Sequence, residues 1–249
     1  MSRLAVQTHT LRTLDESIEE KLDRIADAGY EGAQFTPALG DRSPEDLAEA
    51  VEERGLEIAG LHVDRERLED EYEAALEDYR ALGTTDLVIS TYHRENYESE
   101  AGIAEAADHL GGLADRLADD GFTLHYHNHY FEFTDLDGRS GFEAFADATE
   151  GSLRLEVDTG LAYHGDADPA ALIEQYADRI TLLHLTDTIP GSNETAHTEL
   201  HEGEVDLQSC IDAAVEADVE WIIYENGRTD DPAASIVDAA EKIEAMLDA

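Results

Sequence analysis

LHYHNHYFEF, residues 124–133, reads as the end of a β-strand and the turn that follows it. Side chains alternate along a strand, so His125, His127 and His129 lie on one face, and Glu132 comes soon after them. Imidazoles and carboxylates at a strand end are typical of sites where metals bind or protons move. The alternation alone does not choose which of the three histidines would be a ligand.

Three later segments repeat this arrangement, in which an apolar strand ends in a side chain able to bind metal. LRLEVD ends at Asp158, ITLLHLTD carries His184, and EWIIYE ends at Glu225. The carboxyl ends of parallel strands in a barrel open on one shared mouth. We therefore expect four strand ends to converge on one ion.

Outward from these segments, short β-rich runs alternate with longer segments that carry apolar residues at helical spacing. The predicted strands cover residues 4–9, 31–36, 56–63, 86–92, 122–129, 152–158, 179–185 and 220–225. The predicted helices cover residues 14–28, 44–54, 66–81, 100–119, 141–149, 169–176, 207–217 and 232–248. Eight strand–helix units in 249 residues, without a linker-like tract, predict an α/β fold with a single (β/α)8 barrel domain over residues 1–249.

Polar residues also stand at the ends of the first four predicted strands. They are His9, Gln34, His62 and the pair Tyr92-His93. Each could serve the same mouth or could simply be a polar residue of a loop. The longest irregular segment, residues 186–205, follows the strand with His184 and is a candidate lid or substrate loop.

The charge of the chain is extreme, because 60 acidic residues face 16 basic ones and the formal net charge is −44. Acid spread along the whole length keeps a folded protein hydrated at high salt, where screening removes the self-repulsion. We therefore expect a cytoplasmic protein of a halophile. Intrinsic disorder is excluded by the periodic apolar residues that run from end to end.

The same composition argues against several other classes of protein. Nucleic-acid binding relies on Lys and Arg that neutralise phosphates, and these residues are few here. We expect no membrane span, because no apolar run approaches the roughly 20 residues that cross a bilayer. Cys210 is the single cysteine, so an internal disulfide is impossible.

The four strand ends form a chemically coherent set of two imidazoles and two carboxylates. Such a mixed nitrogen and oxygen shell suits Mn²⁺, Co²⁺, Fe²⁺ or Zn²⁺ better than Ca²⁺, which prefers oxygen alone. The alternative is that Asp158 and Glu225 cap neighbouring helices while the histidines pack in the mouth. The coherence of the set favours a metal.

Eight segments in order resemble the xylose isomerase-like TIM barrels, the superfamily of sugar phosphate isomerases/epimerases, ketose 3-epimerases, inosose dehydratase and endonuclease IV. The segments are LAVQTHTLR, AGYEGAQF, GLEIAGLHV, YHNHYFEF, LEVDTGLAYHGDADP, RITLLHLTD, LHEGEVDL and IIYENGRT. Each is weak alone, but their order and spacing along nearly the whole chain are specific. The resemblance implies the barrel fold and a sugar-related substrate.

The family usually holds its metal with a Glu, an Asp, a His and a second Glu from four strand ends. The resemblance places the last three on Asp158, His184 and Glu225, and it places His127 where the first Glu stands. The branch with a YHNH segment favours His127 over His129 as the ligand. The implied cofactor is a divalent metal, with Mn²⁺ as the first candidate and Co²⁺, Fe²⁺, Mg²⁺ or Zn²⁺ as alternatives.

Three departures from the family pattern bear on the chemistry. Epimerases of the family use two glutamates on opposite faces of the substrate, and here only Glu225 of that pair remains as the candidate general base. Glu132 or a histidine is the candidate opposing acid. Leu161 stands where many relatives have a histidine, and Thr186 stands where the YHNH branch often has a lysine.

Further polar residues are candidate substrate contacts, and these are His62, His129, Asp187 and Arg228. The planar guanidinium of Arg228 suits a phosphate or carboxylate, because it donates hydrogen bonds in pairs. Each of these residues could equally make a local hydrogen bond in a loop.

The leading hypothesis is a metal-dependent isomerase or epimerase that acts on a keto sugar, sugar phosphate or related derivative. A proton is removed next to a carbonyl, and the metal stabilises the resulting enediolate. The main alternative is a lyase or dehydratase that acts on an inosose or a 3-keto-glycoside with the same metal site.

Two hypotheses come from other classes. One is a non-catalytic sugar-binding barrel. The other is an endonuclease IV relative, against which the acidity argues because DNA binding needs a basic face. For the enzyme we expect a small-molecule sugar as the partner and a homo-oligomer, either a dimer or a tetramer.

Overall fold

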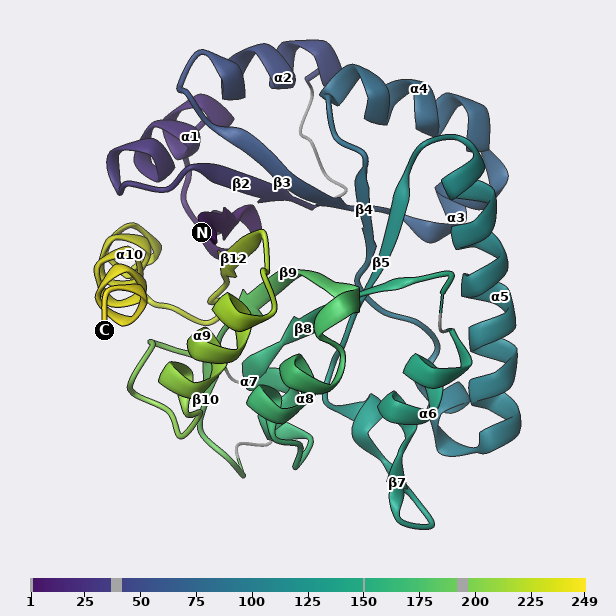
Figure 1. Cartoon of the computed structure of the whole chain (residues 1–249). Helices are drawn as coiled ribbons and strands as arrows, with labels where there is room; N and C mark the ends of the chain where they lie inside the picture. Colours follow the sequence, from purple (N-terminus) through teal and green to yellow (C-terminus); the bar gives the residue numbers. More distant parts are fainter. Residues whose placement is uncertain (1, 37–41, 150, 192–196) are drawn as a thin grey trace.

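The computed structural model describes residues 2–36, 42–149, 151–191 and 197–249. Eight parallel strands close into a barrel in the order β1-β12-β9-β8-β5-β4-β3-β2, which confirms the predicted fold (Figure 1). The barrel strands are β1 (Arg3–Gln7), β2 (Gly32–Phe35), β3 (Glu57–His62), β4 (Asp86–Ile89), β5 (Thr123–His127), β8 (Arg154–Asp158), β9 (Ile180–Leu185) and β12 (Trp221–Tyr224). The first and last strands pair in parallel and close the ring.

Helices surround the strands on the outside of the barrel (Figure 1). They are α1 (Ile18–Asp27), α2 (Pro44–Glu52), α3 (Arg65–Asp70), α4 (Tyr72–Leu82), α5 (Glu100–Asp119), α6 (Gly141–Ala148), α7 (Thr159–His164), α8 (Pro169–Gln175), α9 (Leu207–Glu216) and α10 (Pro232–Leu247). Single 3-10 turns are η1 (Thr8–Leu11), η2 (Arg94–Glu98), η3 (Phe131–Phe133) and η4 (Ala177–Arg179). Within the described residues, no helix is long and apolar enough to cross a membrane.

Local capping explains where several helices begin. Ser17 accepts a hydrogen bond from the backbone of Glu20, whose side chain accepts one from Ser17 N, and this reciprocal capping box opens α1. Ser140 and Glu143 open α6 in the same way. The predicted helix over residues 66–81 is divided into α3 and α4, because Glu71 leaves the helical region with φ −123° and ψ 37°.

Several expected strands are shorter than predicted, and for two of them this matters for the site. β4 ends at Ile89 and β5 ends at His127, whereas the sequence pattern extended them to residues 92 and 129. Tyr92-His93 and His129 therefore lie in loops above the barrel rather than in strands. Loops above strand ends carry the polar groups in this architecture.

The segment over residues 186–205 contains a small hairpin in the part that the structure describes. β10 (Asp187–Thr188) pairs antiparallel with β11 (His197–Thr198). A second hairpin, β6 (Asp135–Leu136) with β7 (Arg139–Ser140), projects beyond the helices (Figure 1). Residues 192–196 of the predicted lid lie outside the described residues.

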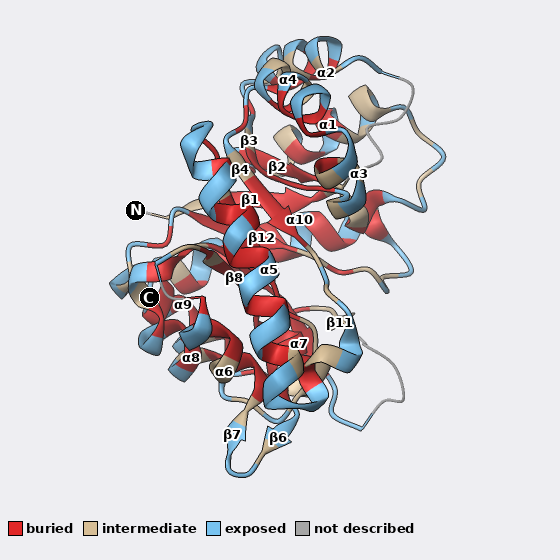
Figure 2. Cartoon of the chain, turned by 90° about the vertical axis from the view of Figure 1, so that its right-hand side faces the viewer, coloured by how far each residue is buried: buried red, intermediate tan, exposed pale blue. Residues whose placement is uncertain are grey.

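Most of the apolar core lies between the strands and the surrounding helices, whose inward faces are buried and outward faces exposed (Figure 2). A second apolar group fills the interior of the barrel itself. Its members are Ala5, Ala59, Val88, Leu182, Trp221 and Ile223. Inward-pointing side chains from alternate strand positions fill barrels of this kind in layers, so the interior is solid below the polar mouth.

Trp221 closes the interior at the amino end of the strands. A Cβ added at Gly32 would lie 2.7 Å from its ring, so only glycine leaves room for the indole there. The guanidinium of Arg3 lies over the Trp221 ring, with its central carbon 4.0 Å from the ring centroid. Apart from the Asp86–His125 ion pair, the polar cluster of the barrel interior lies toward the opposite end.

Candidate active site at the carboxyl end of the barrel

A cavity of about 480 Å³ opens at the carboxyl ends of the strands. Its lining residues are Gln7, His9, Arg12, Thr36, His62, Ser90, Thr91, His127, His129, Leu161, His197, Glu225, Gly227 and Arg228. Ionisable side chains dominate this list, and Glu225 is its one carboxylate. In a chain of net charge −44, the lining is therefore a place where nitrogen donors gather.

The predicted ligands converge below this cavity. One ligand atom from each of His127, Asp158, His184 and Glu225 lies within 4.8 Å of the others. His184 Nδ1 is 3.1 Å from Glu225 Oε2 and 3.9 Å from Asp158 Oδ2. These four side chains come from the ends of β5, β8, β9 and β12, as the sequence pattern predicts.

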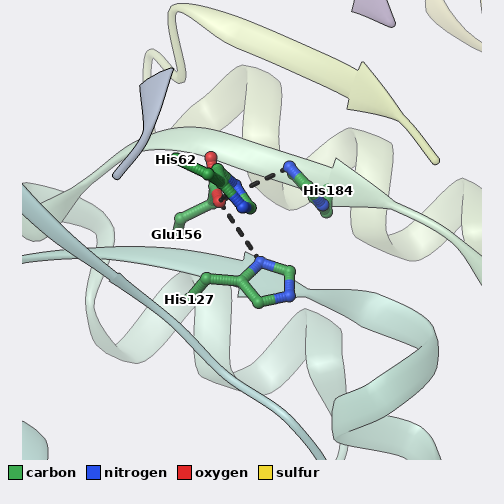
Figure 3. A group of neighbouring side chains, drawn as sticks. All are labelled: His62, His127, Glu156 and His184. Carbon is green, nitrogen blue, oxygen red and sulfur yellow. Dashed lines mark hydrogen bonds and ion pairs between the residues drawn. The ribbon is translucent and has the colours of Figure 1, made fainter. Parts of the chain in front are cut away.

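Glu156 is one residue of this cluster that the sequence reasoning missed. It is fully buried on β8, two residues before Asp158 and on the same face of the strand. Its Oε2 lies 3.0 Å from His62 Nε2, 3.2 Å from His127 Nδ1 and 3.4 Å from His184 Nε2 (Figure 3). One carboxylate thus contacts three imidazoles, and its acid character within an apolar strand was the signal that could have found it.

His62 reaches this group because β3 is irregular. Gly60 has a φ of +104°, and the pairing of β2 with β3 shifts register between Ala33 and Phe35. Ala59 and His62 consequently both face the barrel interior although they are three residues apart. Burial lowers the pKa of His62 despite the neighbouring carboxylate of Glu156, so this imidazole is neutral at pH 7.

The charges of the cluster favour a cation in its centre. Burial alone would lower the pKa of His127, but the hydrogen bond to Glu156 and the charges of Glu156, Asp158 and Glu225 outweigh it and raise that pKa to about 9. Burial would raise the pKa of Glu225, yet its hydrogen bond with His184 and the nearby imidazoles hold it below its ordinary value. The carboxylates are therefore ionised and attract positive charge.

Two local hydrogen-bond groups hold the strand ends in place. The side-chain amide of Asn128 accepts from Asp158 N at 2.9 Å and donates to Asp158 O at 3.3 Å, which ties β5 to β8. Thr186 Oγ1 donates to Asp158 Oδ1 at 2.6 Å and accepts from Gly160 N at 2.7 Å. The threonine that departs from the family pattern thus positions a predicted ligand.

The β10–β11 hairpin brings a further residue, His197, over the cluster. Its Nε2 lies 3.4 Å from Asp158 Oδ2, without the alignment of a hydrogen bond. Burial lowers the pKa of His197, but the charge of Asp158 outweighs it and the pKa lies above its ordinary value. Sequence periodicity does not predict this placement, because His197 belongs to the long irregular segment over residues 186–205.

Two groups of side chains could hold an ion, and buried atoms without a hydrogen-bond partner distinguish between them. His62, His127, Glu156 and His184 form a second group whose ligand atoms also lie within 4.8 Å of one another. The mutual contacts of that inner group satisfy its atoms. By contrast, Asp158 Oδ2, His129 Nδ1 and His197 Nε2 are buried without a hydrogen-bond partner among the described residues. Of these three atoms, Asp158 Oδ2 belongs to the outer set, and because buried polar atoms seldom stay without a hydrogen bond, that set fits a metal.

Two predicted site residues take part in the fold rather than in the mouth. Glu132 is buried, and its oxygens accept from Tyr126 OH at 2.7 Å and His129 N at 2.9 Å. Asp187 accepts from the backbone N–H groups of residues 188, 203 and 205 and so shapes the loop before α9. Neither side chain lines the cavity, because each has its oxygens turned toward its own supporting segment.

The other predicted substrate contacts do line the cavity, and these are His62, His129 and Arg228. The structure adds Arg12, which the sequence reasoning did not single out. Its guanidinium donates to the carbonyl of His9 at 3.1 Å and to the carbonyl of Gly227. Two backbone carbonyls therefore hold this cation at the rim of the cavity.

The fold and this site define the class of protein. Residues 22–246 match the family described as xylose isomerase-like TIM barrel, so the chain belongs to that family. Its curated relatives include the inosose dehydratase of Clostridium botulinum, which is 24% identical over 85% of this chain and 82% of the relative. The resemblance inferred from the eight sequence segments is confirmed.

Solved structures show the same fold. A sugar phosphate isomerase/epimerase from Parabacteroides distasonis superposes with a TM-score of 0.81 at 21% identity, covering 98% of this chain and 94% of that one. An L-ribulose 3-epimerase superposes with a TM-score of 0.72 at 16% identity, covering 100% and 95%. At these identities the likeness concerns the fold, and the chemistry must be argued from the residues.

Proposed function

We propose that this protein is a metal-dependent isomerase or epimerase that acts on a keto sugar or a sugar derivative. The observation that carries the proposal is the convergence of His127, Asp158, His184 and Glu225 beneath a polar cavity, with Asp158 Oδ2 buried and lacking a hydrogen-bond partner among the described residues. Family membership supports an enzyme that handles small sugar-like molecules. Isomerases, epimerases and dehydratases are all represented among the relatives.

The four converging side chains would hold a divalent metal, with Mn²⁺ as the first candidate. Such an ion supplies Lewis acidity, which polarises a substrate carbonyl and acidifies the adjacent C–H. Two imidazole nitrogens with two carboxylates give the mixed donor set that first-row metals accept. Co²⁺, Fe²⁺, Mg²⁺ and Zn²⁺ remain alternatives to be compared by loading.

Glu225 is the general base of this proposal. Among the described residues it is the one carboxylate that lines the cavity, and its low pKa keeps it ionised at neutral pH. We assign the opposing acid to His197 rather than to Glu132, because His197 lines the cavity and the charge of Asp158 holds its pKa above the ordinary value despite burial, whereas burial lowers the pKa of His129 to about 4. The histidine alternative thus replaces the glutamate that the sequence pattern suggested.

The rim of the cavity supports an anionic or strongly polar substrate. Arg12 and Arg228 lie in its lining, and a guanidinium pairs well with phosphate or carboxylate oxygens. Leu161 supplies an apolar wall where many relatives would place an imidazole. We accordingly place sugar phosphates and keto acids first in a substrate screen, followed by neutral keto sugars.

A lyase that uses the same base is the second candidate. The similarity to inosose dehydratase favours it, as does the absence of the second glutamate from the position of His127. In that reaction Glu225 would remove the proton and an imidazole such as His197 would protonate the departing hydroxyl. Loss of water changes the product mass, whereas isomerisation and epimerisation do not.

The test begins with elemental analysis of wild type, His127→Ala and Glu225→Ala, each purified in molar KCl. We expect about one transition metal per wild-type chain and its loss in both variants. Keto sugars and their phosphates are then incubated in deuterated water with the loaded enzyme. Incorporation of deuterium next to the carbonyl, detected by mass spectrometry and NMR, identifies proton abstraction and separates the three reactions by product.

The control is Asp86→Asn, which changes a carboxylate at the amino end of β4 that contacts His125 rather than the cluster. It should retain the metal and the exchange of deuterium. A folded wild type that takes up no Mn²⁺, Co²⁺ or Zn²⁺ would overturn the proposal in favour of a binding barrel. Gel filtration and salt titration test the accompanying proposals of a homo-oligomer and of a halophilic, cytoplasmic enzyme.

A further inference from the structure

We propose that Glu156 is a positioning residue that fixes which nitrogen of His127 and of His184 faces the metal. The inference rests on the proposed function, because it concerns the same four-ligand centre. Glu156 itself stays outside the ligand set and acts from beneath it. The assignment follows from the donors and acceptors that surround this one buried carboxylate (Figure 3).

The argument for His184 starts at Gln34. Gln34 Nε2 donates to Glu156 Oε1 at 2.5 Å, because an ionised carboxylate can only accept. The other end of the amide, Oε1, therefore accepts, and it already takes a hydrogen bond from Gln7 Nε2 at 2.7 Å. His184 Nε2 lies 2.7 Å from the same Oε1.

An amide oxygen cannot donate, so His184 must carry a proton on Nε2. In the unloaded protein Nδ1 carries a second proton, which it donates to Glu225 Oε2 at 3.1 Å, and it lies 3.9 Å from Asp158 Oδ2, so it is the nitrogen whose proton a metal would displace. The geometry assigns Nδ1 as the ligand atom of His184. A chain of two glutamine amides thus sets the tautomer of a metal ligand.

His127 is oriented by the same carboxylate but with the opposite result. Its Nδ1 lies 3.2 Å from Glu156 Oε2 and must donate to it. Nε2, at the far side of the ring from Glu156, is the nitrogen whose proton a metal would displace, which makes Nε2 the ligand atom. His62 Nε2, at 3.0 Å, donates to Glu156 in the same manner.

An amide at position 156 could not replace the carboxylate. Glu156 receives hydrogen bonds from Gln34, His62 and His127, and His184 Nε2 lies 3.4 Å away. A glutamine has one accepting oxygen, and its NH₂ group would face donors. At least one imidazole would have to change tautomer or lose its partner, and metal affinity falls when such supporting groups are lost.

The primary experiment reads tautomers directly. Two-dimensional NMR of protein with ¹⁵N-labelled histidine, treated with EDTA and then loaded with Zn²⁺, reports the protonated and the metal-bound nitrogen of each ring. We expect His184 to be protonated on Nε2 and to bind through Nδ1, and His127 to show the reverse. The unloaded spectrum already tests the assignment of His184, so this readout does not depend on activity.

Calorimetric titration with Zn²⁺ then compares wild type with Glu156→Gln. We expect affinity to fall about 10- to 100-fold, together with a changed tautomer for at least one of the three imidazoles. Glu132→Gln is the matched control, because Glu132 is equally buried but contacts none of the proposed ligands. Its Zn²⁺ affinity should equal that of wild type.

Gln34→Leu provides a second variant if Glu156→Gln does not fold. It removes the acceptor for His184 Nε2 and should mix the tautomers of that one ring. Zn²⁺ bound through His127 Nδ1 or His184 Nε2, or wild-type affinity in folded Glu156→Gln, would overturn the inference while leaving the proposed function intact. A wild type without any metal affinity would overturn the proposed function, and the unloaded tautomers would still decide the role of Glu156.

Discussion

The two ends of the barrel interior contain opposite kinds of side chain. At the amino end, Trp221 and five aliphatic residues fill the space. At the carboxyl end, three carboxylates and several imidazoles occupy the same cylinder, and some of their atoms are buried without a partner. The comparison indicates that the amino end, which holds one buried ion pair between Asp86 and His125, stabilises the fold mainly through apolar packing, while the carboxyl end concentrates buried charged groups that a ligand or ion would further satisfy.

The substitution Glu225→Gln gives the strongest test of the functional role of the carboxyl end. Removing the proposed base should lower kcat for deuterium exchange by about 10²- to 10⁴-fold. The amide also offers a weaker metal ligand, so the exchange rate should be measured at saturating Mn²⁺. Activity near that of wild type in this variant would contradict the role of Glu225.

The amino end predicts a different response in Trp221→Ala. The indole is 4% exposed and fills the space beside Gly32, so its loss leaves a cavity and should cost about 3–5 kcal/mol in the free energy of unfolding. Chemical denaturation in molar KCl measures this cost. Zn²⁺ affinity of the folded fraction should stay at the wild-type value, and a large loss of affinity would show that the two ends are coupled.

Some residues of the polar carboxyl end could be predicted from the sequence, and others could not. The strand ends at Asp158, His184 and Glu225 follow from apolar runs that stop at a polar residue, and those runs are local. His197 reaches the site through a long loop, and no periodicity defines the path of a loop. Long-range packing, which the local pattern does not contain, decides such placements.

Glu156 and Glu132 illustrate two opposite errors of prediction, because the first was missed and the second was expected in the site. Alternation already places Glu156 on the face of Asp158, so a closer reading of LRLEVD could have found it. Glu132 looked like a site residue because it follows the histidines, but the turn η3 directs it toward Tyr126 on the outer face of β5. Proximity in sequence did not correspond to proximity in the mouth.

Glu132 also makes the stability of the protein depend on pH. Burial raises its pKa to about 7, even though the hydrogen bonds from Tyr126 and His129 oppose the shift. The folded state therefore binds the proton more tightly than the unfolded state, and stability is lost as pH rises from about 4.5 to about 7. The loss is about 3 kcal/mol when fully developed.

Glu132→Gln should remove this dependence, because its amide resembles the protonated acid in donating to Tyr126 OH and accepting from His129 N. Urea denaturation at several pH values between 5 and 8 compares the two proteins. The variant should show a flatter profile and should be the more stable one at pH 8. Parallel profiles would mean that another group titrates in this range.

The smallest predicted effect comes from removing one hydroxyl group at each end of the barrel. Thr186→Val removes the donor to Asp158 Oδ1 and the acceptor for Gly160 N, while Thr84→Val removes a hydroxyl near the backbone of Asp86 at the amino end. Both should lose about 1–2 kcal/mol of stability, since each leaves a backbone or carboxylate group without its partner. Only Thr186→Val should also weaken Zn²⁺ binding, by up to about 10-fold, because Asp158 is then free to turn away from its companion ligands. Equal Zn²⁺ affinities in the two variants would show that Asp158 keeps its orientation through Leu161 N alone, which donates to the same oxygen at 2.7 Å.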